Sequence, residues 1–301
     1  IHATGANFLN NGRSVEFIPY QNYGFGGIPI SDGSFFRNCT FNITNDYKGL
    51  AVNYPFSHHV TMWDVTGVKF YGNTFKNEHT GALEGLGDGI YSYNAGFNVT
   101  RYPLNLSQSP NSFFDLKQGI SIDGDMRGKP KSVLIDRNDF DGTTIGIMIS
   151  NVENVTAIRN SFSVGNGRGI ELLDCHDNIG IYATNTAQFR IEENVFTEPT
   201  PKTADYTIGT LIHHSGGNDK ELYKNSYNGL DYGILATGKN RVPYIATYPA
   251  GNTGLRILCN SFTGNTNDVG VSGNNTAPNY EGIAMFQGSN ALSAGNRFNT
   301  S

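Results

Sequence analysis

Cysteine is scarce in this chain, and its three occurrences form no recognisable pattern. Cys39, Cys175 and Cys259 are widely spaced, and no Cys-x-x-Cys pair is present. An odd number of distant cysteines is not a disulfide framework, and unpaired cysteines do not predict a structural zinc site. We expect all three to be small buried residues, so cysteine content indicates no redox compartment.

Charged residues and long apolar runs are scarce as well. Only 16% of the residues are charged, against an average of about 25%. The 21 Lys and Arg residues are scattered, whereas phosphate binding needs them clustered, so no nucleic-acid partner is expected. No run of 18 apolar residues occurs, so this segment should contain no membrane span.

Glycine and asparagine are abundant instead, with 37 Gly and 36 Asn among 301 residues. Average glycine usage is about 7%, well below the share found here. Both residues tolerate left-handed backbone and end strands. The composition therefore predicts many short strands joined by frequent turns.

One motif recurs along the chain: Asn, any residue, then an aromatic residue. The clear copies begin at Asn73, Asn111, Asn138, Asn160, Asn194, Asn225, Asn260 and Asn296, and a looser copy runs from Asn38 to Phe41. An alternating apolar segment precedes each Asn, and a second one, usually opened by Gly-Ile, follows it. The shortest spacing, 22 residues, sets the minimal coil, and longer spacings add surface loops.

This pattern predicts an all-β fold, a single-stranded right-handed parallel β-helix (solenoid) of about nine or more coils with loop insertions. Residues 1–301 should form one continuous domain, a fragment of a longer chain. The repeated Asn should sit at a left-handed bend and bond to the Asn of the next coil, with the aromatic residue packed beneath it. A β-propeller would need a period of about 40–50 residues.

Residues 59–75 (HVTMWDVTGVKFYGNTF) and 89–97 (GIYSYNAGF) carry a resemblance to known proteins. They resemble the large exported right-handed parallel β-helix repeat proteins of Bacteroidetes-type bacteria, within the pectate-lyase-like solenoid superfamily. The resemblance extends over nearly the whole chain through its repeats. It implies a secreted or cell-surface protein, often exported by type IX secretion. It implies no single function, because this fold also carries lyases, hydrolases, epimerases and adhesins.

The outward side chains after each Gly-Ile should stack in two columns on one face of the solenoid. We place Tyr91, Ser121, Met148, Glu171 and Leu235 in the first column, and Tyr93, Asp123, Ser150, Leu173 and Thr237 in the second, with His214 as a further member of the second. Asp123 and Glu171 would lie about 12 Å apart, and Asp123 or Asp125 about 10 Å from Asp174. Paired glycosidase carboxylates stand about 5–9.5 Å apart, so catalysis is not favoured.

Two polar clusters remain as candidates. Residues 174–177 (Asp-Cys-His-Asp) could join a Ca²⁺ shell or serve acid-base chemistry, and otherwise form a polar turn. Asp123 and Asp125 are the second candidate, with Arg127 for substrate binding. The alternative is again a polar turn, because Asp-Gly is a turn dipeptide. In the adjacent pairs His58-His59 and His213-His214, one residue should pack and the other face solvent, so neither pair should chelate one metal ion.

Aromatic residues offer a binding surface instead. Tyr91 and Tyr93 should both face outward on one strand, where they either present a flat surface to sugar rings or lie under the long segments 76–88 or 94–110, whereas we expect Trp63 in the core. The favoured function is a β-helix module acting as adhesin, spacer or glycan-binding surface without catalysis. Its partner would be an extracellular glycan or other domains of the same protein, and no cofactor is expected. The alternatives are a polysaccharide lyase or glycoside hydrolase using Asp123, Asp125, Glu171, Asp174, Asp177 or His214, and a phage tailspike-like depolymerase.

Overall fold

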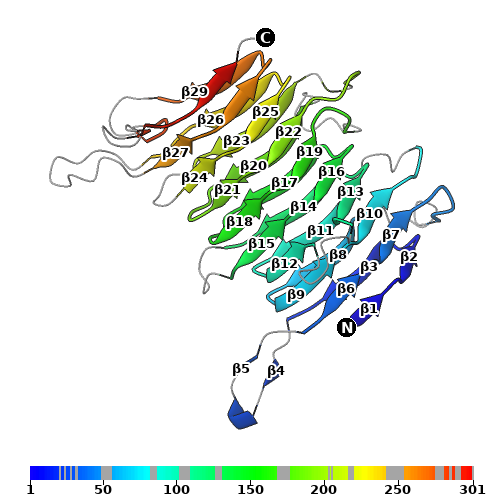
Figure 1. Ribbon diagram of the computed structural model, residues 1–301. Coiled ribbons are helices and arrows are strands. Elements are labelled where there is room, and N and C mark those ends of the chain that lie inside the picture. Colours follow the sequence, from blue (N-terminus) through cyan, green and yellow to red (C-terminus); the bar gives the residue numbers. More distant parts are fainter. Residues whose placement is uncertain are drawn as a thin grey trace.

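Three parallel β-sheets run the length of the molecule. The computed structural model describes residues 1–19, 22–23, 25–27, 29–30, 33–48, 56–81, 87–101, 109–125, 131–167, 177–202, 204, 206–215, 220–241, 254–274, 281–284, 287–288 and 293–299. Figure 1 shows the strands stacked as rungs from the N-terminal (blue) to the C-terminal (red) end. The predicted fold class is confirmed: the chain is an all-β parallel solenoid.

Sheet A holds the alternating segments that precede each Asn. Its strands are β1 (His2–Thr4), β6 (Phe35–Arg37), β9 (Thr66–Tyr71), β12 (Gly96–Thr100), β15 (Val133–Asp136), β18 (Val155–Ile158), β21 (Arg190–Glu192), β24 (Lys220–Tyr223) and β27 (Leu255–Leu258). Neighbouring strands in this list are hydrogen-bonded in parallel.

Sheet B contains the residues that follow each Asn. Its strands are β2 (Asn7–Leu9), β7 (Thr40–Ile43), β10 (Thr74–Asn77), β13 (Ser112–Phe114), β16 (Asp139–Asp141), β19 (Ser161–Ser163), β22 (Val195–Thr197), β25 (Ser226–Asn228), β28 (Ser261–Thr263) and β30 (Arg297–Asn299). One aromatic ring per rung points inward, and successive rings from Phe8 to Phe298 stack nearly parallel, with centroids 4.6–5.2 Å apart.

Sheet C holds the strands that carry the Gly-Ile mark, together with others in register with them that lack it. Its strands are β3 (Arg13–Phe17), β8 (His58–Trp63), β11 (Asp88–Tyr93), β14 (Gln118–Asp123), β17 (Ile145–Ser150), β20 (Asn178–Thr184), β23 (Thr207–His213), β26 (Tyr232–Thr237) and β29 (Asn267–Ser272). The glycine recurs because space is lacking: a Cβ at Gly89 would lie 2.8 Å from the Phe113 ring and 2.6 Å from a backbone oxygen. A short antiparallel pair, β4 (Asn22–Tyr23) and β5 (Pro29–Ile30), flanks the 3₁₀ turn η1 (Phe25–Gly27).

Buried asparagines form the predicted ladder between sheets A and B. Asn138, for example, donates both its backbone N–H and its side-chain Nδ2 to Oδ1 of Asn160 on the next coil. The predicted left-handed bend, however, lies one residue earlier, as at Arg137 and Arg159, where φ is 57°. The bend turns the chain, so that the Asn amide that follows points along the solenoid axis. In the loose first copy Asn38 takes the bend and Cys39 takes the ladder position, where its N–H donates to Asn73.

Two further sequence predictions about the coils were wrong. Cys39 is buried as expected, but Cys259 is exposed because it occupies a left-handed bend between strands; Cys175 lies outside the described residues. The place in sheet C that we predicted for Gly169-Ile170 belongs to β20, which pairs with β17 through Ile147 and Ile181. No helix in the part of the chain that the structure describes has the length and apolarity to cross a membrane.

Candidate functional site

The outer face of sheet C presents three columns of side chains at its N-terminal end. Across β3, β8, β11 and β14 the first column is Arg13, His58, Asp88 and Gln118, the second is Glu16, Thr61, Tyr91 and Ser121, and the third is Trp63, Tyr93 and Asp123. Parallel pairing places neighbours in a column about 4.8 Å apart. Residues from four distant segments therefore share one surface.

Trp63, Tyr91 and Tyr93 form an aromatic platform on this face. Tyr91 and Tyr93 alternate outward on β11, as predicted. Trp63 is 38% exposed and its ring centroid lies 5.3 Å from that of Tyr93 and 6.0 Å from that of Tyr91. The prediction that Trp63 belongs to the core was wrong, because Val60 and Met62 take the inward phase of β8 and leave Trp63 outward.

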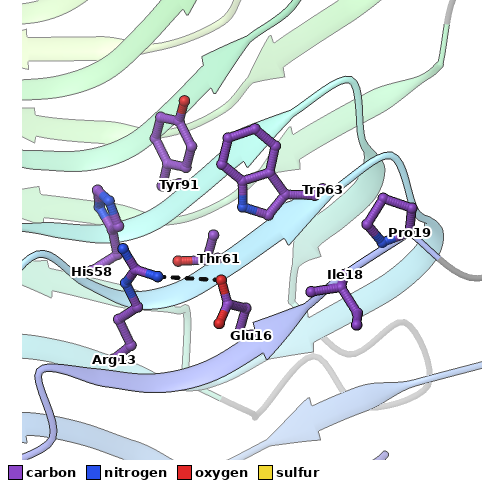
Figure 2. Close-up of a pocket in the computed structure, with 8 residues that line it drawn as sticks. All are labelled: Arg13, Glu16, Ile18, Pro19, His58, Thr61, Trp63 and Tyr91. Atoms are coloured by element: carbon purple, nitrogen blue, oxygen red, sulfur yellow. Dashed lines mark hydrogen bonds and ion pairs between the residues drawn. The ribbon is translucent and has the colours of Figure 1, made fainter.

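A groove of about 320 Å³ lies beside the platform, above the middle of β8. Figure 2 shows Arg13 and Glu16 along one side, Trp63 and Tyr91 along the other, and Thr61 between them. The Arg13 guanidinium pairs with the Glu16 carboxylate at 3.3 Å, and both side chains are largely exposed. Such an exposed pair contributes little to stability.

His58 lines the groove next to Arg13 and forms a dyad with Asp88 on β11. The His58 Nδ1 atom lies 3.1 Å from the Asp88 carboxylate, which is almost fully buried. The imidazole also stacks on Tyr91, with ring centroids 4.8 Å apart and planes 21° from parallel. Burial, followed by the charges of Asp123 and Asp88, raises the pKa of the Tyr91 phenol, so its hydroxyl stays protonated and able to donate.

Among the predicted catalytic residues that the structure describes, Asp123 and Asp177 lie far apart. Asp123 ends β14 beside Tyr93, whereas Asp177 lies just before β20, so the two are roughly 20 Å apart by rung and residue spacing. Asp125 is exposed, and its backbone N–H donates to the Asn94 side chain. Arg127, Glu171 and Asp174 lie outside the described residues; the column positions predicted for Glu171 and Leu173 are held by Tyr182 and Thr184.

The two histidine pairs had different outcomes. His59 is fully buried and His58 partly exposed, as predicted. His213, not His214, joins the column of Asp123, and His214 follows it in a left-handed turn with φ of 45°. This turn interrupts the strand alternation, so the two rings meet at 4.1 Å instead of facing opposite sides. The described residues contain no group of three or more His, Cys, Asp or Glu placed to hold a metal ion.

Sequence reasoning missed His58, Thr61, Asp88, Arg13 and Glu16. The missing signal was the alignment of His59 with the recurring glycine of sheet C. With Val60 and Met62 set against Ile90 and Ser92, the outward residues of β8 fall into the columns of Tyr91 and Tyr93. Because β8 lacks the expected Gly-Ile mark, the sequence did not reveal how β8 aligns with β11.

The fold and the outer-face site together define a parallel β-helix protein with an aromatic groove on one sheet. The chain belongs to the family described as periplasmic copper-binding protein (NosD), whose sequence profile matches residues 41–298. No curated protein sequence matches it. Among solved structures it is similar to PfbA, a surface adhesin of Streptococcus pneumoniae, at 10% identity and a TM-score of 0.30, covering 96% of this chain and 73% of that one. A likeness at this level carries no argument about function.

Proposed function

We propose that this chain is a non-catalytic β-helix module of an exported protein and that it binds an extracytoplasmic glycan on the aromatic platform. The observation that carries the proposal is the platform itself: three aromatic side chains held on adjacent rungs beside a groove. Aromatic rings are rigid and amphipathic, and they offer an apolar face to the C–H face of a sugar ring while hydroxyls meet nearby polar groups.

The family description, which names the periplasm, supports a location outside the cytoplasm. Type IX export, a Bacteroidetes-type source and an adhesive or spacer role stay predictions. A polysaccharide lyase or hydrolase, or a tailspike-like depolymerase, remains the alternative. The separation of Asp123 from Asp177 does not favour that pair, because paired-carboxylate hydrolysis needs the two groups within about 10 Å.

Copper appears in the family description, and the described side chains do not fit a copper centre. Copper in proteins is held by imidazole, thiolate or thioether donors. His213 and His214 lie together, but no third His, Cys, Asp or Glu among the described residues completes a group with them, and the Nδ1 atom of His213 is bonded to Thr237. No step of the proposed function therefore involves copper. The predicted calcium cluster at residues 174–177 lies outside the described residues except for Asp177.

The Trp63→Ala variant is expected to weaken glycan binding by about 10-fold or more, because it removes the largest ring of the platform. Isothermal titration against neutral and acidic oligosaccharides measures this. Tyr206→Ala is the matched control, since Tyr206 is 54% exposed and lies outside the platform and its groove. Equal binding by the Trp63 variant and the wild type would rule out the platform as the glycan site, and release of reducing ends or unsaturated products would favour an enzyme.

A further inference from the structure

One hydroxyl in the groove has no partner. Thr61 is only 2% exposed, and its Oγ1 atom makes no hydrogen bond, although Thr61 lines the groove. Buried hydroxyls almost always have a partner, so an orphaned one needs an explanation. Figure 2 shows Thr61 at the centre of the groove, surrounded by Glu16, His58 and Trp63. A ligand group entering the groove would supply the missing partner.

The neighbouring His58 offers a second polar atom. Its Nδ1 atom faces the Asp88 carboxylate, which accepts and therefore holds the proton on Nδ1. In the neutral ring Nε2 is then an acceptor. His58 and Thr61 both line the groove from β8 although they are three residues apart, because the alternation is interrupted at His59 and Val60, which are both buried, and Trp63 follows two residues after Thr61. The strand thus places an acceptor, a hydroxyl and an aromatic ring in one row.

The groove's charges are already paired. Among the described residues that line the groove, Arg13 is the permanent cation, and it faces Glu16, so they present no fixed positive charge without an opposite charge beside it. A uronate or sulfate ester would need such a cation to replace its hydration. Neutral hydroxyls need only the donors and acceptors that Thr61 and His58 supply.

We propose that Thr61 and His58 form a polar subsite that binds the hydroxyls of an uncharged pyranose stacked on Trp63. The ligand class is then a neutral glycan rather than a uronate or a sulfated one. This inference rests on the proposed function, since it names the ligand of the same groove. It assigns recognition to the hydroxyl at Thr61 and stacking to the platform.

The test compares Thr61→Val with Thr61→Ser in titrations against neutral, uronate and sulfated oligosaccharides of equal length. Thr61→Val keeps the shape of the side chain and removes the hydroxyl. It should weaken neutral-glycan binding about 10-fold, while its thermal midpoint stays equal or rises because the orphaned hydroxyl is gone. Thr61→Ser, which keeps the hydroxyl, should bind like the wild type.

Each other outcome overturns a defined part. Unchanged binding by Thr61→Val, with binding still lost in Trp63→Ala, removes the subsite and leaves the glycan-binding function standing. Tighter binding of uronate or sulfated chains overturns the neutral class. A lower thermal midpoint in Thr61→Val shows that the Thr61 hydroxyl already has a partner in the free protein, which overturns the subsite. Absence of binding to every oligosaccharide removes both proposals.

Discussion

The Asn160→Ala variant is expected to lose about 4 kcal/mol of unfolding free energy. Asn160 is buried at the centre of the ladder, and its Oδ1 atom accepts from both the N–H and the Nδ2 of Asn138. Its own Nδ2 donates to the Ile135 carbonyl and to Asn194. Alanine leaves the Asn138 donors and the Ile135 carbonyl without these partners in a dry interior, at about 1–3 kcal/mol each.

Urea denaturation followed by circular dichroism measures this loss. Asn98→Ala is the matched control, because Asn98 faces outward on β12 and should change stability by less than about 0.5 kcal/mol. Since each coil of a solenoid contacts only its neighbours, hydrogen exchange should accelerate first in β15, β18 and β21. A loss below about 1 kcal/mol would show that the ladder serves register and not stability.

Acid should destabilise the protein through His59. Burial, reinforced by the nearby His58, lowers the pKa of His59 to about 3, against an ordinary value of 6.5, although its bond to the Lys76 carbonyl opposes the shift. Because Nε2 donates to that carbonyl, protonation would add an N–H at Nδ1, which is buried without a partner. The unfolded chain binds the proton first, so this contribution is complete above about pH 6.5 and is lost as pH falls toward 3.

The expected loss is about 3 kcal/mol between pH 7 and pH 4. The contribution of His59 to this loss is isolated by comparing the wild type with His59→Gln. Glutamine keeps an amide donor for the Lys76 carbonyl and does not titrate. Denaturation midpoints measured from pH 7 to pH 4 should fall more steeply in the wild type, because acidic residues contribute equally to both. Parallel profiles would mean that His59 is protonated in the folded protein.

The candidate site was predictable only in part. Tyr91 and Tyr93 follow directly from alternation after Gly89, and the structure places both on the outer face. Trp63 follows His58-His59 in an alternating segment, which favours the core, but β8 carries His59 where other strands of sheet C carry glycine, and this shifts the phase. The ring of His59 is buried and packs against Phe56, with centroids 4.6 Å apart.

The sequence by itself determined the rung of this solenoid. Period-two alternation, the Asn-x-aromatic mark and the recurring glycine are local features, and they define a parallel coil without knowledge of its neighbours. Only the tertiary structure decided which outward side chains share a surface. Arg13 and His58 are direct neighbours across β3 and β8 although 44 residues separate them. The lengths of the connecting segments vary, so the register between coils depends on the ring stack and the asparagine ladder, which exist only once the coils are packed.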